Sequence, residues 1–119
     1  MPEAGSGAGL LQRSLFDDPD DMTLRAAWRD LVERRLPEAA RRHPDWPVHL
    51  DHCFARILLD AVHRRPWREV VAPPAWRNTA APRLAAAVRL GEAVLDGTAD
   101  LSALNRQSLS LRGKQRRMS

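Results

Sequence analysis

Cysteine occurs once in this chain, at Cys53, so its 119 residues cannot form an intramolecular disulfide and nothing favours a secreted protein. No segment approaches the roughly 18 uninterrupted apolar residues of a membrane-spanning helix. The first residues also lack the basic start and apolar stretch of a secretory signal peptide. We therefore expect a soluble cytoplasmic protein without a membrane partner.

Lysine is equally scarce, because eighteen of the nineteen basic residues are arginines and the exception is Lys114. The net charge of +4 would suit a polyanionic partner. Arginine together with abundant alanine is, however, what GC-rich codon usage produces, so the arginines are weak evidence for phosphate recognition. Acidic residues are interspersed over most of the chain, and a marked basic excess is found only at its C-terminal end.

The sequence also lacks any sustained alternation of apolar and polar residues, which is the pattern of a β-strand. It therefore predicts an all-α fold, a compact bundle of about four helices around one modest core. We expect a flexible leader at residues 1–16, a single helical domain at 17–111 and a basic tail at 112–119. The sequence leaves the oligomeric state open.

Apolar spacing and the positions of proline and glycine predict the helix boundaries. The predicted helices are residues 23–42 with a kink or restart at Pro37, 47–63, 82–96 with Gly97 as the stop, and 99–111. An acidic segment at 17–21 is expected to supply capping carboxylates for the first helix. Between the second and third helices we expect one or two helical turns at 66–71 and a largely non-helical connection at 72–78.

The predicted helix at 47–63 gathers ionisable and thiol side chains on one face. At about 100° per residue, six of them fall within an arc of about 100°. They are His49, His52, Cys53, Arg56, Asp60 and His63. Apolar residues take nearly all of the remaining circumference, which predicts a helix packed on most sides. The polar face is then either solvated or the wall of a pocket.

We interpret this face as a binding site for a small anionic or flat polar ligand. Arg56 supplies a planar fork of donors, and His49 and His52 can add further donors. Trp67 and Trp76 lie in irregular segments downstream, from which either could close the site with an aromatic wall.

Other interpretations of the same face stay open. Arg56 and Asp60 are four residues apart and could simply form an intrahelical ion pair. His49 and Cys53 have the same spacing, which suits two ligands of one metal ion, although no CxxC or HExxH motif accompanies them. Cys53 beside a histidine could also be a nucleophile, or a small core residue. The sequence therefore names no catalytic residue and no cofactor.

The basic C-terminal end offers a second class of function, as an interaction or nucleic-acid accessory protein. Its candidate polyanion-binding residues are Arg112, Lys114, Arg116 and Arg117. Such contacts with phosphates would be salt-sensitive and independent of sequence. No helix-turn-helix, zinc-finger or RNP motif supports specific recognition.

Three parts of the chain resemble a group of small all-α bacterial and fungal proteins. They are His-Cys-Phe-Ala-Arg at 52–56, Asp60 with Pro66-Trp67, and Leu-Asn-Arg-Gln-Ser-Leu-Ser-Leu-Arg-Gly-Lys at 104–114. The resemblance covers about residues 22–114. Some of those proteins carry a GCN5-related N-acetyltransferase label, which implies acetyl transfer as a remote alternative. A GCN5-type enzyme has an α/β fold with a glycine-containing pyrophosphate loop, and this sequence predicts neither strands nor that loop.

Overall fold

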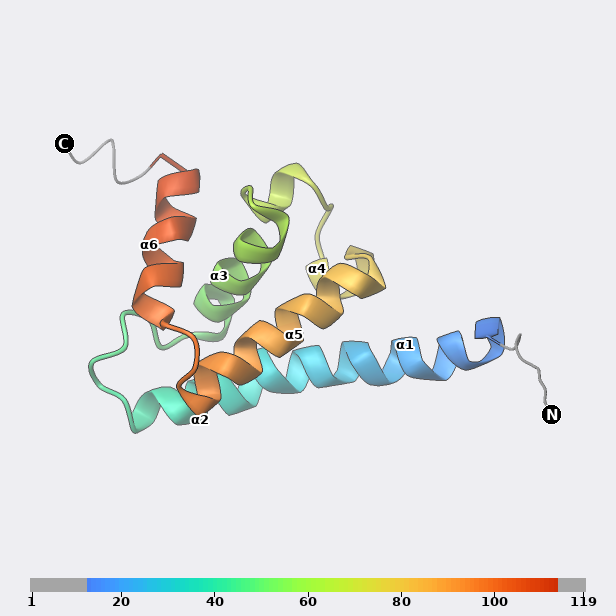
Figure 1. Ribbon diagram of the computed structural model, residues 1–119, viewed down its shortest axis with the longest axis horizontal. Helices are drawn as coiled ribbons and strands as arrows, with labels where there is room; N and C mark the ends of the chain where they lie inside the picture. Colours follow the sequence, from blue (N-terminus) through green and yellow to red (C-terminus); the bar gives the residue numbers. More distant parts are fainter. Residues whose placement is uncertain (1–12, 114–119) are drawn as a thin grey trace.

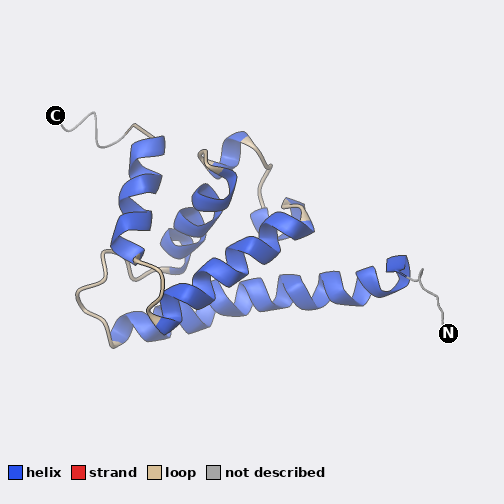
Figure 2. Cartoon of the chain, in the orientation of Figure 1, coloured by secondary structure: helices blue, strands red, loops and turns tan. Residues whose placement is uncertain are grey.

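The computed structural model describes residues 13–113, with side chains from Asp21 onward, and this part of the chain contains helices and no strand (Figure 2). The prediction of an all-α fold is thereby confirmed. The elements in chain order are α1 (Arg13–Asp30), a π-helical segment (Leu31–Arg35), α2 (Leu36–Arg41), α3 (Asp51–His63), a 3-10 turn (Trp67–Glu69), α4 (Ala75–Asn78), α5 (Ala81–Asp96) and α6 (Leu101–Leu111).

Helix α3 is the element around which the others pack. It contacts α5, α6, the π-helical segment and the 3-10 turn (Figure 1). Phe54, Ile57, Leu58 and Leu59 of this helix are all buried. The wide apolar arc in its sequence therefore corresponds to a helix that is covered on most sides, as predicted.

The long first helix begins at Arg13, ten residues earlier than the apolar periodicity indicated. Residues 13–16, expected in the leader, and the acidic segment 17–21 both belong to it. Asp21 is joined to the helix by an ion pair with Arg25 at 2.9 Å. The rest of the predicted leader, residues 1–12, lies outside the described residues. The prediction was wrong because an acidic, polar run carries no apolar periodicity even when it is helical.

The interruption predicted at Pro37 takes the form of a π-helical segment followed by a new α-helix. Pro37 lies in the first turn of α2, where its missing N–H breaks no intrahelical bond. The wider π turn precedes it, and the Leu36 N–H donates to the Leu31 carbonyl, five residues back. Leu31, Val32 and Leu36 all reach the core from this segment.

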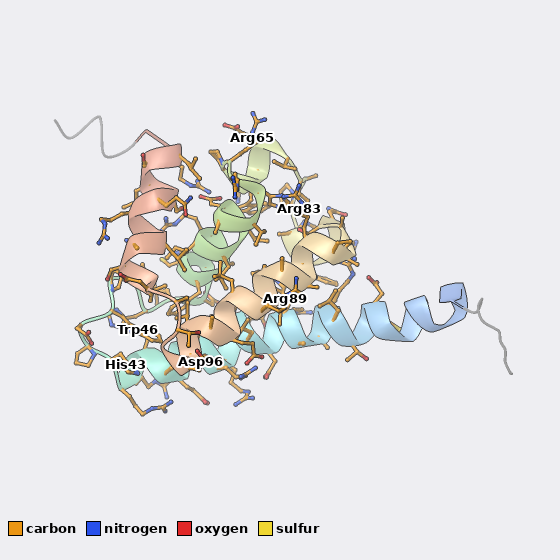
Figure 3. All side chains as sticks on the ribbon, viewed as in Figure 1. His43, Trp46, Arg65, Arg83, Arg89 and Asp96 are labelled. Carbon is orange, nitrogen blue, oxygen red and sulfur yellow. The ribbon has the colours of Figure 1, made fainter. Side chains whose placement is uncertain are left out.

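Helix α3 begins at Asp51, four residues later than predicted, because Leu50 is extended (φ −107°, ψ 150°). His49 therefore precedes the helix. The residues before it form a turn in which His43 stacks on Trp46, with ring centroids 4.6 Å apart (Figure 3). Trp46 in turn lies edge-on to Phe54, so it fixes the start of α3 against the core.

The C-terminal half follows the sequence closely. Helix α5 ends at Gly97, which adopts the left-handed conformation (φ 86°), and α6 begins after Asp100, whose carboxylate accepts a hydrogen bond from the Ala103 N–H. The connection at 72–78 differs from the prediction, since its last four residues form the single turn α4. Among the described residues, no helix has the length and apolar character needed to cross a membrane.

Candidate functional site

The polar face of α3 divides between two environments. Near its start, the His52 side chain is 74% exposed. Just over two turns later, Asp60 is fully buried against α6. Five of the six residues of the predicted arc lie on α3, because His49 precedes the helix, and these five do not share one pocket.

Asp60 is a structural carboxylate rather than a pocket-lining acid or base. Its Oδ2 accepts hydrogen bonds from Ser108 Oγ at 2.6 Å and Arg112 Nε at 2.8 Å. Its Oδ1 accepts from Arg112 Nη2 at 3.0 Å and from the Trp67 backbone N–H at 2.8 Å. A buried charge is tolerated only when it is paired and hydrogen-bonded in this way. The carboxylate joins α3 to the end of α6 and to the 3-10 turn.

Arg56 is also tied to α6, and the intrahelical ion pair with Asp60 is not formed. Its Nη1 donates to Ser108 Oγ at 2.8 Å, and its Nη2 donates to Asn105 Oδ1 at 2.9 Å. Ser108 therefore lies between the two side chains, accepting from Arg56 and donating to Asp60. Both partners of Arg56 are neutral, so no direct ion pair among the described residues offsets its charge.

A pocket of about 390 Å³ opens beside this interface. Its lining consists of His52, Arg56, Trp67, Arg68 and Arg112. No acidic side chain is part of that lining, and among the described residues Arg112 alone of its three arginines forms an ion pair, with Asp60. The guanidinium carbon of Arg68 lies 5.3 Å from the centroid of the Trp67 ring. We call this the cationic pocket.

Several predicted site residues lie elsewhere. Trp76 borders a different, apolar pocket, and Cys53 is half-buried and packs against the hydrophobic core. His63 lines a separate cavity together with Arg65 and Arg83. Burial lowers the pKa of His63, and the positive charge of Arg83 lowers it further.

The metal interpretation loses its geometric premise. His49 precedes α3, so it and Cys53 are not successive turns of one helix. Within the described part of the chain, no three His, Cys, Asp or Glu side chains come together as a metal-binding group.

The four basic C-terminal candidates fall into two groups. Arg112 forms its ion pair with the buried Asp60 at 2.8 Å, so it belongs to the helix interface and is a poor candidate for binding a polyanion. The other candidates, Lys114, Arg116 and Arg117, lie outside the described residues.

Three residues of the site were not singled out from the sequence. Asn105 and Ser108 hold Arg56, and Arg68 closes one side of the cationic pocket. Asn105, Ser108 and Arg112 follow the i, i+3, i+7 spacing of one helix face, which was an available signal. Arg68 lies in an irregular segment and has no comparable signal.

No protein-family model, curated protein or solved structure matches this chain. The resemblance to the bacterial and fungal group therefore stays an expectation, and acetyl transfer stays with it.

Proposed function

We propose that this protein binds a small organic anion, a carboxylate or phosphate, in the cationic pocket. The observation that carries the proposal is the lining itself. His52, Arg56, Arg68 and Arg112 surround one cavity that no acidic side chain lines. Of the carboxylates nearby, Asp60 lies behind the cavity in its ion pair with Arg112, and Asp51 lies 3.6 Å from His52 Nδ1. The excess positive charge of the site therefore comes from Arg56 and Arg68.

The geometry suits recognition of a planar anionic group. A guanidinium presents donors in a fixed fork, which matches the two oxygens of a carboxylate or phosphate. Trp67 adds an aromatic wall on which a flat part of the ligand can lie. The volume of about 390 Å³ falls within the roughly 300–1,000 Å³ of ordinary ligand pockets.

Two of the arginines are held in place before any ligand arrives. Arg56 is fixed by Ser108 and Asn105, and Arg112 is fixed by Asp60. Arg68 is exposed, and its cation–π contact with Trp67 leaves its guanidinium able to turn toward a ligand. Preorganised donors reduce the entropy lost on binding.

Charge reversal at Arg68 tests the proposal. Titration calorimetry with phenyl phosphate should show Arg68→Glu binding at least tenfold more weakly than the wild type. Arg77→Glu is a matched control because Arg77 is also exposed, also lies 5.3 Å from a tryptophan ring, and does not line the pocket. Equal losses in the two variants, or no binding by the wild type, would contradict the proposal.

Binding through the basic tail remains the competing function. Deleting residues 114–119 leaves the Arg112–Asp60 pair in place. If an oligonucleotide binds and this deletion abolishes binding while Arg68→Glu does not, the tail and not the pocket carries the function.

A further inference from the structure

A second pocket, of about 220 Å³, adjoins the cationic pocket. Three tryptophans line it: Trp28, Trp67 and Trp76. Four of its remaining lining residues are aliphatic, namely Val32, Ala55, Leu59 and Ala75, and the other four are Arg29, Glu33, Asp51 and His52. We call this the tryptophan pocket.

The two pockets share His52 and Trp67. Their separation follows from the geometry of α3, because Ala55 and Arg56 are adjacent in sequence and so lie about 100° apart around the helix. Ala55 faces the tryptophan pocket, and Arg56 faces the cationic pocket. Trp67 lines both pockets, so a ligand that occupied both would extend past this side chain.

The rim and the floor of the tryptophan pocket differ in character. At the rim, Arg29 pairs with Glu33 at 3.2 Å and lies 5.0 Å from the Trp76 ring centroid. On the floor, Trp28 is only 2% exposed and belongs to the core. Asp51, the other acidic residue of the lining, is exposed and lies 3.6 Å from His52 Nδ1. This pocket therefore offers mainly apolar contact and no unpaired positive charge of the kind that Arg56 and Arg68 provide.

We infer that the tryptophan pocket is the subsite for the apolar part of the ligand whose anionic group occupies the cationic pocket. This inference rests on the proposed function. Alone, a volume of about 220 Å³ is below the roughly 300–1,000 Å³ of ordinary ligand pockets, but it suits one arm of a larger molecule. The ligand class is then an amphipathic anion, an aliphatic or aryl carboxylate, with its charge at Arg56 and Arg68 and its apolar group beyond Trp67.

A series of straight-chain carboxylates from acetate to decanoate tests this assignment by titration calorimetry. Each methylene that enters the tryptophan pocket should tighten Kd about fourfold, which is the factor that corresponds to burying one CH₂ group. The gain should stop once the pocket is full. Inorganic phosphate, which has no apolar part, reports on the cationic pocket alone.

A substitution that fills the tryptophan pocket should remove the gain in affinity with chain length. Ala75 is half-buried on α4 and lines this pocket but not the cationic one. Ala75→Leu should abolish the chain-length dependence while leaving acetate and phosphate binding within about twofold of the wild type. Ala55→Leu fills the same pocket from α3, and Ala26→Leu, at an exposed position on α1 outside both pockets, is the control.

The outcomes separate the two proposals. If phosphate binds but Kd is the same for every chain length, the tryptophan pocket is not a subsite and the cationic pocket stands. A chain-length gain that survives both Ala75→Leu and Ala55→Leu places the chain elsewhere and also overturns the inference. If the wild type binds neither phosphate nor any carboxylate, the proposed function fails, and the subsite fails with it.

Discussion

Helix α3 is held by two interfaces of opposite chemistry. Toward α5 and the π-helical segment its contacts are apolar and close, formed by Ile57, Leu58 and their neighbours. Toward α6 they are polar, with Arg56 and Asp60 hydrogen-bonded to Asn105 and Ser108 of that helix and to Arg112, which directly follows it. Apolar packing follows from the hydrophobic pattern of each helix, whereas the polar interface depends on individual partners. A polar helix face is therefore not by itself evidence of a ligand site, because here Asp60 serves the contact between helices.

Among changes to the polar interface, we expect Asp60→Ala to lower the free energy of unfolding most. Asp60→Ala leaves the Arg112 guanidinium and the Ser108 hydroxyl without their carboxylate, and removing one partner of a buried ion pair costs about 3–5 kcal/mol. We expect a fall of this size in the free energy of unfolding, measured by urea denaturation.

Glu92→Gln is the control for a pair at the surface. Glu92 and Arg35 form an ion pair at 2.9 Å in which the side chains are 47% and 36% exposed. Pairs of this kind contribute at most about 1 kcal/mol. Equal losses for Asp60→Ala and Glu92→Gln would show that burial adds nothing to the α3–α6 contact.

The apolar interface should respond to overpacking at Gly91. A Cβ atom at this position of α5 would lie 2.5 Å from Leu31 Cδ2 and 3.1 Å from Leu58 Cδ1. We expect Gly91→Val to lower the free energy of unfolding by about 1–3 kcal/mol, the usual cost of forcing extra methyl groups into a packed core.

Ala86→Val provides the comparison on the same helix, at a half-buried position. It introduces the same valine side chain, so it measures how far a β-branched residue lowers the free energy of unfolding on this helix away from the close contact. A loss in Ala86→Val as large as that in Gly91→Val would argue against a close approach of α5 to the π-helical segment.

The smallest expected effect is a pH dependence at His63, in the last turn of α3. Its Nε2 atom is buried and has no hydrogen-bond partner in the described structure, and its pKa lies below the ordinary value, chiefly because of burial. The unfolded chain therefore binds a proton more readily than the folded one. Stability is fully present above the ordinary pKa of about 6.5 and is lost as the pH falls below it.

Thermal unfolding of His63→Leu across pH 5 to 7.5 checks this dependence. The variant lacks the titrating group, so its stability relative to the wild type should rise as the pH falls. Parallel pH profiles for the two proteins would show that the loss of stability at low pH comes from other groups.

The elements that the sequence predicted well are those whose stability is local. Helix α5, its Gly97 stop and helix α6 follow from apolar spacing and capping residues that lie within a few positions of one another. The early start of α1 and the late start of α3 were missed. In both places the residues are polar or adjoin prolines, so periodicity gives little information.

The candidate site was predicted only in part, because helical spacing gives information about residues within one helix. Helical spacing identified Arg56 and His52, and Trp67 was expected as an aromatic wall. The side-chain partners of Arg56 and Asp60 lie 48 to 52 residues away, on α6 and at the Arg112 that follows it, and no periodicity within one helix can reveal them. Arg112 changed most, from a polyanion-binding candidate to the counterion of a buried carboxylate.

The π-helical segment sets the rotation of α1 relative to everything that follows it. It accommodates one residue more per turn than an α-helix does. If Leu31–Arg35 took α-helical geometry without losing a residue, the preceding residues would turn by about 100° around the axis relative to α2. Trp28 would then leave its place in the core and in the tryptophan pocket. The π-helical turn thus determines which side of α1 packs against the rest of the protein.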